Sequence, residues 1–304
     1  MTTEDDLEKF ANVIGVTLNH VADEALILSR FEEFINPKPA SIFDGIKEEE
    51  IDEKIGAATE MMGGPPKVWL MLADEPSPIA DTYPESTFQE AVSIFWRARK
   101  SVCRAHLYCM ATQSMKDSPE YIFNDQPEEL KKIITRAATG SFWENAETGY
   151  LRLASYWDRI GQILDFRFFR IRQFERDGFT AVMDRIHSNV KPVSIQLSNS
   201  DSWKLIRKFQ TSEKDEGLKW LLRRRNILVH SLHLRAAKDS IDEVAFKPMY
   251  NHLEEKLKSR LAPRTPEEEV KQLYLQLSQA ANLFPHVINV ICSEEDKPTP
   301  PLGG

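Results

Sequence analysis

The sequence predicts an all-α protein, built as a helical bundle with an additional N-terminal helical region. Glycine is scarce, at 12 of 304 residues, and long stretches are rich in Leu, Ala, Glu, Lys, Arg and Gln. These residues keep most of their side-chain freedom in a helix. Apolar residues also recur at three- and four-residue steps over long segments, as on one face of a helix. With 41% apolar residues the chain can bury a large core, and we expect two parts.

The first part, residues 1–140, is predicted to begin with a long helix over residues 7–34. Its apolar residues form a single stripe, which we expect to pack inward. The prolines within residues 36–39 end this helix, because proline lacks a backbone donor and restricts the residue before it. A second break falls at residues 63–66, Gly-Gly-Pro-Pro, and the segment from there to Pro84 is expected to be irregular.

Two further helices complete the first part. One is predicted over residues 85–115, and a short one starts at Pro127, since proline suits a first helical position. We place a boundary near Gly140, followed by a helical bundle over residues 141–293. Residues 294–304 are rich in Pro and Gly and are expected to form a disordered tail.

The bundle is predicted to open with a helix over residues 142–176, stopped by Asp177-Gly178. A shorter helix to about residue 188 and a loop or minor strand over residues 190–198 follow. The remaining helices are expected from their capping residues. The first ends at residue 209 and is capped by Ser200 and Asp201. The second covers residues 213–234, and Ser212 with Asp215 resembles a capping box at its start. The last is opened by the capping box Thr265-Pro266-Glu267-Glu268.

Several protein classes are excluded by composition. No apolar run approaches the ~20 residues needed to cross a bilayer, and the first eight residues are acidic where a secretory signal would be basic. We therefore expect a cytoplasmic protein with no membrane partner. Cys103, Cys109 and Cys292 have no paired spacing, so they are expected to be reduced and mostly buried, without a disulfide or zinc site.

The charge of −8 is unevenly distributed along the chain. Residues 1–60 hold 5 Lys and Arg against 15 Asp and Glu, whereas residues 200–235 hold 9 against 4. A local excess of five positive charges can attract a phosphate backbone even when the whole protein is acidic. The pattern permits RNA as a partner, and a solvated basic helix face fits it equally well.

Residues 223–230, Arg-Arg-Arg-Asn-Ile-Leu-Val-His, carry the most distinctive chemistry. RNA can be cut by its own 2′-hydroxyl, so an enzyme needs only to move protons and stabilise a charged phosphorane. His230 can transfer protons near neutral pH, and Arg225 can hold two phosphate oxygens at once. On a helix Asn226 and His230 share a face, while Arg225 and His230 are offset by roughly 140°. A second copy of the helix could complete the site, which favours a homodimer.

The spacing of Arg225, Asn226 and His230 on a helix resembles the HEPN superfamily (higher eukaryotes and prokaryotes nucleotide-binding), which includes many ribonucleases. The run Tyr-Trp-Asp-Arg-Ile-Gly at residues 156–161 is also similar to that superfamily. The resemblance covers the C-terminal half and implies metal-independent cleavage leaving a 2′,3′-cyclic phosphate. It assigns phosphate binding to Arg225, proton transfer to His230 and orientation to Asn226. Some toxin members carry a tyrosine two residues after the histidine where this chain has Leu232, so control through that residue is not expected.

Other charged residues are assigned to supporting roles. Asp158 is expected to support one of the site arginines, with a surface ion pair as the alternative. A metal shared by His230 and His233 lacks further ligands at a recognised spacing. RNA binding is expected to involve Arg223, Arg224, Arg159 and Arg207.

The sequence thus predicts an endoribonuclease without metal or cofactor, in a toxin, stress or antiphage role. The region of residues 1–140 would sense, bind a partner or inhibit the site, and an antitoxin or regulatory protein is a further expected partner. The alternative is a non-catalytic helical module that binds nucleotides or proteins. In that case Arg223 to Arg225 form a solvated face, and His230 is a core histidine or caps the helix C-terminus.

Overall fold

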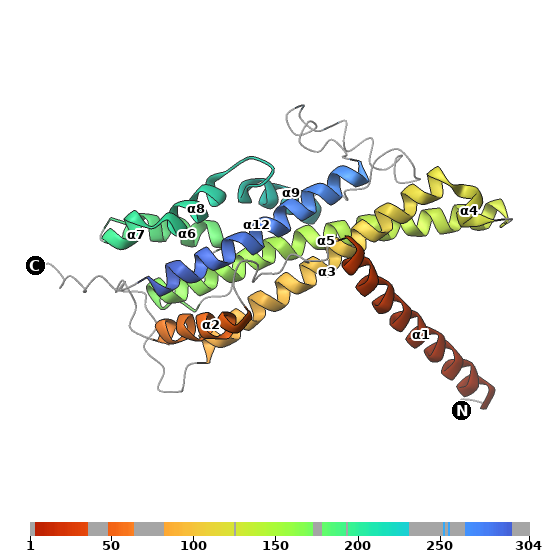
Figure 1. Cartoon of the computed structure of the whole chain (residues 1–304), viewed down its shortest axis with the longest axis horizontal. Coiled ribbons are helices and arrows are strands. Elements are labelled where there is room, and N and C mark those ends of the chain that lie inside the picture. The colour runs from red at the N-terminus through yellow and green to blue at the C-terminus, as the bar shows by residue number, and fades with distance from the viewer. Residues whose placement is uncertain are drawn as a thin grey trace, which may run out of the picture.

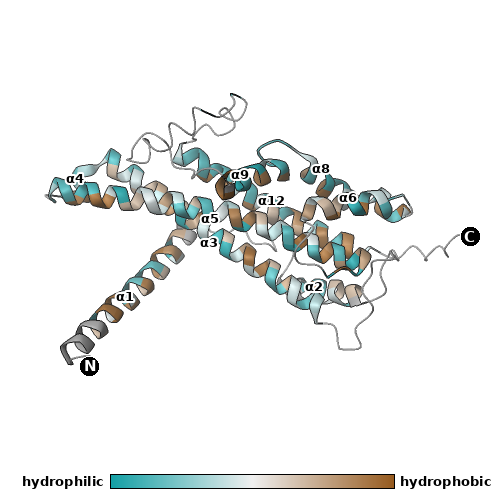
Figure 2. Ribbon diagram, turned by 180° about the vertical axis from the view of Figure 1, so that it is seen from behind, coloured by the Kyte–Doolittle hydropathy of each residue, from teal (hydrophilic) through white to brown (hydrophobic). Residues whose placement is uncertain are grey.

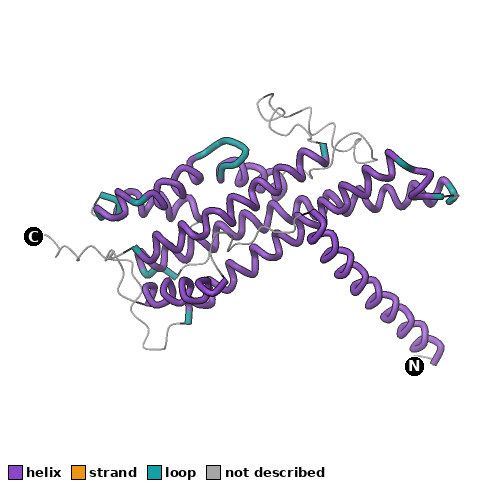
Figure 3. The backbone as a smooth tube through the Cα atoms, in the orientation of Figure 1, coloured by secondary structure: helices purple, strands orange, loops and turns teal. Residues whose placement is uncertain are grey.

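The computed structural model describes residues 4–35, 48–63, 82–124, 126–172, 178–192, 194–230, 252, 255 and 265–293. Every regular element within these residues is a helix, which confirms the all-α prediction (Figure 3). The helices are α1 (Glu4–Ile35), α2 (Glu48–Gly63), α3 (Tyr83–Asp117), α4 (Pro119–Phe123), α5 (Glu128–Phe169), α6 (Phe179–Asn189), α7 (Ile195–Asn199), α8 (Asp201–Thr211), α9 (Leu218–His230) and α12 (Pro266–Cys292). None of these described helices combines the length and the apolar content needed to span a membrane.

The long helices α3 and α5 form the spine of the molecule. They pack along each other over the most extensive contact in the described structure, and α12 lies against both (Figure 1). One continuous core joins these helices to α2, α6, α8 and α9. Its largest fully buried side chains are Trp157, Arg167, Tyr150, Tyr156, Phe88, Phe95, Phe142, Phe166, Phe168, Phe169, Phe179 and Phe284.

The expected division near Gly140 is wrong, because α5 runs through this residue without a break. Ala138, Phe142 and Ala146 are buried at successive four-residue steps, so one apolar stripe crosses the proposed boundary. A glycine inside a helix costs only about 1 kcal/mol, which this packing easily exceeds. The short helix expected from Pro127 and the helix expected from residue 142 are therefore one element.

The end of α5 also differs from the prediction. The helix stops at Phe169, because Arg170 takes a left-handed conformation with φ of 58°. The Arg170 N–H donates to the carbonyl oxygen of Phe166 at 3.0 Å, which is a typical way of closing the last turn. Residues 173–177, which include part of the expected stop signal, lie outside the described residues.

Two of the predicted caps are confirmed. Ser200 Oγ accepts the Trp203 N–H at 3.2 Å at the start of α8. At the start of α12, Thr265 and Glu268 form the complete capping box, and Pro285 lies within α12 without ending it. In both caps the side chain bonds to a backbone group only three residues away in the sequence, so the sequence alone specifies them.

Two other local predictions are corrected. A short helix, α7, lies within the expected loop or strand, with Ser194 Oγ accepting the Leu197 N–H. The helix expected over residues 213–234 begins only at Leu218. The Ser212 Oγ accepts instead the N–H of Lys214, so this serine closes a turn before α9 and forms no capping box.

The first 63 residues hold two departures from expectation. A helix, α2, occupies the acidic segment for which no helix was predicted, while residues 64–81 lie outside the described residues. The helix predicted over residues 7–34 is present as α1, but the expectation that it packs inward is wrong. It projects away from the spine (Figure 1), and over residues 11–31 its apolar stripe is exposed except at Leu28 and Phe31, which are buried.

The cysteines are mostly buried, as predicted. Cys103 and Cys109 are buried, and Cys292 is half-buried. Burial raises the pKa of the Cys109 thiol to about 11, with the charge of Glu267 adding to the effect. This thiol is therefore protonated and unreactive near neutral pH. The predicted tail over residues 294–304 lies outside the described residues.

Candidate functional site

The helix α9 carries the predicted motif and is fixed to the bundle by one buried face. Leu218 and Leu221 are fully buried on this face, and Arg224 follows three residues later at 5% exposure. The helix packs against α5 and α8. Because successive residues on a helix are about 100° apart, burying position 224 turns positions 225 and 226 toward the rim of the contact.

Arg224 makes a buried ion pair and is not a surface contact for RNA, which corrects the role expected for it. Its Nη2 binds Oε1 of Glu269, a carboxylate on α12 with no exposed surface. The hydroxyl of Tyr150 donates to the other oxygen of this carboxylate at 2.6 Å. The guanidinium also lies over the rings of Tyr150 and Trp220, at 5.8 and 6.0 Å from their centroids. Arg224 therefore anchors α9 to α5 and α12.

Arg225 and Asn226 lie on the outer side of this anchor. Asn226 is exposed and Arg225 is half-buried. Arg225 Nη1 donates to Asn226 Oδ1 at 3.3 Å, so the amide and the guanidinium are held together. Within the described parts of the chain, Arg225 has no carboxylate within 4 Å, unlike Arg223 and Arg224 beside it.

Asp158 on α5 lies within electrostatic range of Arg225. Its Oδ1 accepts the Phe179 N–H at 3.4 Å, across from Gly178, where an added Cβ would approach the carboxylate to 3.0 Å. Burial raises the pKa of Asp158, while the hydrogen bond from Phe179 and the positive charges of Arg225 and Arg159 oppose the rise. The structure thus brings Asp158 close enough to Arg225 for their charges to interact, and it also gives the carboxylate a second task as the cap of α6.

His230 is the last residue of α9. It follows Asn226 by one helical turn, so the two backbone positions lie on the same face of the helix. The side chain of His230, together with Leu232 and His233, lies outside the described residues.

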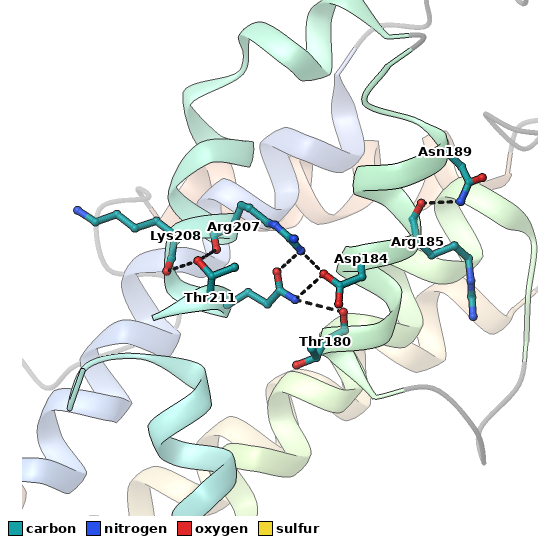
Figure 4. A network of polar contacts seen from close by, with 8 residues as sticks. Thr180, Asp184, Arg185, Asn189, Arg207, Lys208 and Thr211 are labelled. Atoms are coloured by element: carbon teal, nitrogen blue, oxygen red, sulfur yellow. Dashed lines mark hydrogen bonds and ion pairs between the residues drawn. The ribbon is translucent and has the colours of Figure 1, made fainter. Parts of the chain in front are cut away.

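The other arginines expected to bind RNA have carboxylate partners. Arg223 Nη2 lies 3.0 Å from Oε1 of Glu213, and Arg159 Nη2 lies 2.9 Å from Oε1 of Glu90. Arg207 pairs with Asp184 (Figure 4). Each pairing reduces the positive field that the local charge balance suggested, because these side chains are already neutralised by the protein itself.

The partner of Arg207 belongs to a network that ties α8 to α6. Arg207 Nη1 binds both Asp184 and Gln210, and Gln210 Nε2 donates to the Thr180 carbonyl oxygen and to Asp184 Oδ1, each at 3.2 Å. Burial raises the pKa of Asp184, but the hydrogen bonds from Arg207 and Gln210 outweigh this and lower it overall. Figure 4 shows these groups converging between the two helices, which indicates a structural role for Arg207.

Glu269 and Tyr150, which position the motif, were not predicted from the sequence. Glu269 is 45 residues from Arg224, and it closes a run of three glutamates that suits the positive end of the α12 dipole. Its two neighbours in this run are not buried, so only the tertiary structure distinguishes it.

The described residues offer no group of three or more His, Cys, Asp and Glu side chains arranged to hold a metal ion. What they bring together is the half-buried guanidinium of Arg225, the exposed amide of Asn226 and the half-buried carboxylate of Asp158, beside the helical position of His230. An arrangement of this kind can bind an anion such as phosphate through Arg225, while Asn226 and Asp158 orient the Arg225 side chain.

Comparisons of the chain with protein-family models, with curated proteins and with solved structures find no match in any of the three.

Proposed function

We propose that this protein is a metal-independent endoribonuclease whose site is formed by Arg225, Asn226 and His230. The observation that carries the proposal is the environment of Arg225. It is the member of the arginine run without a carboxylate within 4 Å among the described residues, and it is joined to Asn226 on a firmly anchored helix. A cation held in this way keeps its charge available for a phosphate.

In the proposed reaction the 2′-hydroxyl of a nucleotide attacks the adjacent phosphorus and expels the 5′-oxygen of the next nucleotide. His230 transfers the protons, and Arg225 holds the non-bridging oxygens as negative charge develops. The products are a 2′,3′-cyclic phosphate and a 5′-hydroxyl. Asn226 orients Arg225 through their hydrogen bond, and Asp158 orients it through their opposite charges.

The cleavage assay uses purified full-length protein, total tRNA and EDTA. His230→Ala should lower the rate by about 100-fold or more, because proton transfer by a positioned side chain contributes this much. Arg225→Lys should lower the rate by about 10-fold or more, since it keeps the charge and loses the planar fork. Arg223→Lys is the matched control, and it should retain the rate because Arg223 is already paired with Glu213.

We further propose that the site is shared by two chains, because Arg225 and His230 are offset by roughly 140° on one helix. Mixing Arg225→Ala with His230→Ala protein should then restore part of the activity, since one site of the mixed dimer is intact. Full activity of a strictly monomeric protein would exclude the shared site. Absence of cleavage by the wild-type protein in EDTA would exclude the ribonuclease itself.

The cellular role that we propose is defence or stress response in the cytoplasm, with RNA as substrate and an antitoxin or regulatory protein as partner. A second function is favoured by a specific observation. Arg159, Arg207 and Arg223 are neutralised within the protein, while the apolar surface of α1 is exposed. A protein-interaction module has both features, and it would bind a partner without cleaving RNA.

A further inference from the structure

The exposed side of α1 carries apolar residues at the spacing of a coiled coil. They alternate in steps of three and four residues, which keeps them on one seam at a period of 3.5 residues. The seam consists of Ala11, Ile14, Leu18, Val21, Ala25 and Leu28. Such a repeat is typical of a helix that packs lengthwise against another helix, with Ala11, Leu18 and Ala25 at one core position and Ile14, Val21 and Leu28 at the other.

The seam has no partner among the described residues over most of its length. Ile14, Leu18 and Val21 are 42%, 63% and 55% exposed, whereas Leu28 is buried. Leu28 lies between Glu24, which binds Arg104 of α3, and Phe31, whose ring contacts His106 of α3. The seam therefore starts at this junction and extends outward along the projecting helix, where Figure 2 shows apolar residues along α1.

The charges along α1 fit a second copy of the same helix in the antiparallel direction. Residues 10–22 contain no Asp, Glu, Lys or Arg. When two copies cross at residue 16, Ile14 packs opposite the other copy's Leu18, and Ala11 opposite its Val21. Gly15 and Thr17 flank the seam, one on each side. In this arrangement Gly15 faces Gly15 of the second copy and Thr17 faces its Thr17, so no like charges face each other there.

Charge complementarity also favours the antiparallel direction. The first turns of α1 hold four acidic residues within residues 4–8, and this end would reach the other copy's junction of α1 with α3. Three arginines gather there. Arg152 donates to the Arg97 carbonyl oxygen, and after the larger effect of burial the charges of Arg97 and Arg104 lower the pKa of Arg152. Of the three, Arg104 is the one that binds Glu24 of α1, at 3.0 Å. A parallel pair would instead bring the two acidic ends together.

We propose that α1 pairs antiparallel with α1 of a second copy, burying the seam from Ala11 to Ala25 and bringing each acidic end to the other copy's arginine cluster. The helix projects on the side of the α3 and α5 spine opposite α9 (Figure 1), so this surface is separate from the proposed ribonuclease site. Pairing through α1 leaves α9 exposed, and it holds whether or not the protein cleaves RNA.

Sedimentation equilibrium of the full-length protein tests the proposal with two matched variants. Leu18→Glu places a charge in the middle of the seam and should weaken the dimer by about 100-fold or more. Val16→Glu introduces the same charge on a residue that is 69% exposed outside the seam, and it should change the dissociation constant by less than about 3-fold. Circular dichroism should show equal helix content for both variants.

Cysteine cross-linking tests the direction of the pair. Thr17→Cys should form a disulfide-linked dimer under mild oxidation, because residue 17 meets its own copy only in the antiparallel pair. Asn19→Cys, on the outer side of the helix, should not. Wild-type protein that stays monomeric at about 100 μM, or equal weakening by Leu18→Glu and Val16→Glu, would overturn the proposal. RNA cleavage is measured separately on the same samples, so its loss or absence does not bear on the pairing.

Discussion

The buried ion pair beneath α9 leads to a sharp prediction for the variant Glu269→Ala. Glu269 has no exposed surface and Arg224 is 5% exposed, so removing the carboxylate leaves a guanidinium without its counter-ion in the core. The Tyr150 hydroxyl loses its acceptor as well. Breaking one side of a buried pair costs about 3–5 kcal/mol of the free energy of unfolding. For a protein of this size such a loss lowers the melting temperature by roughly 10 °C.

The assay is urea denaturation followed by fluorescence of the six tryptophans, among them Trp220 beside the pair. Glu268→Ala is the matched control, because it removes an adjacent glutamate from the capping box and should cost only about 1 kcal/mol. The double variant Arg224→Met with Glu269→Leu should recover most of the stability, since apolar residues of similar volume replace a buried pair well.

Hydrogen exchange separates a local effect from a global one. In Glu269→Ala the amides of α9 should lose more protection than those of α3, because Arg224 is a direct link between α9 and α12. If Glu269→Ala costs no more than Glu268→Ala, the pair does not anchor α9 and the reasoning about the site is refuted.

Two further predictions concern packing and pH. Gly161→Ala should destabilise the protein by about 1–3 kcal/mol, because the new Cβ would lie 2.8 Å from the Phe179 Cα, whereas Gly15→Ala meets nothing within 4 Å and should raise helix content. Thermal unfolding and circular dichroism measure the two, and equal effects would contradict the close approach. Burial lowers the pKa of His106, so its contribution to stability is present above its ordinary pKa of 6.5 and is lost as the pH falls through the lowered value. Wild-type protein should therefore lose more stability than His106→Gln between about pH 7 and pH 5.

Much of the local structure could be read from the sequence because it depends on neighbours within one or two turns. The Thr265 capping box and the Ser200 cap follow from side chains that bond to backbone groups three residues away. The apolar steps along α3 identified a long helix in the same way. Where the structure departs from prediction, as at Gly140, a weak local break was outweighed by packing along the whole helix.

The limit of prediction from the sequence is clearest at the motif of residues 223–230. Its apolar steps from Leu218 and Leu221 fit a buried residue at either position 224 or position 225, and these differ by about 100° around the helix. The sequence determined that α9 is a helix carrying arginines, an amide and a histidine. Only the tertiary structure decided that Arg224 is the buried anchor and Arg225 the cation left without a near carboxylate among the described residues, because that choice depends on Glu269, which lies 45 residues away. For the same reason α1 was identified as a helix from its own pattern, while its exposure depends on which distant surfaces lie beside it.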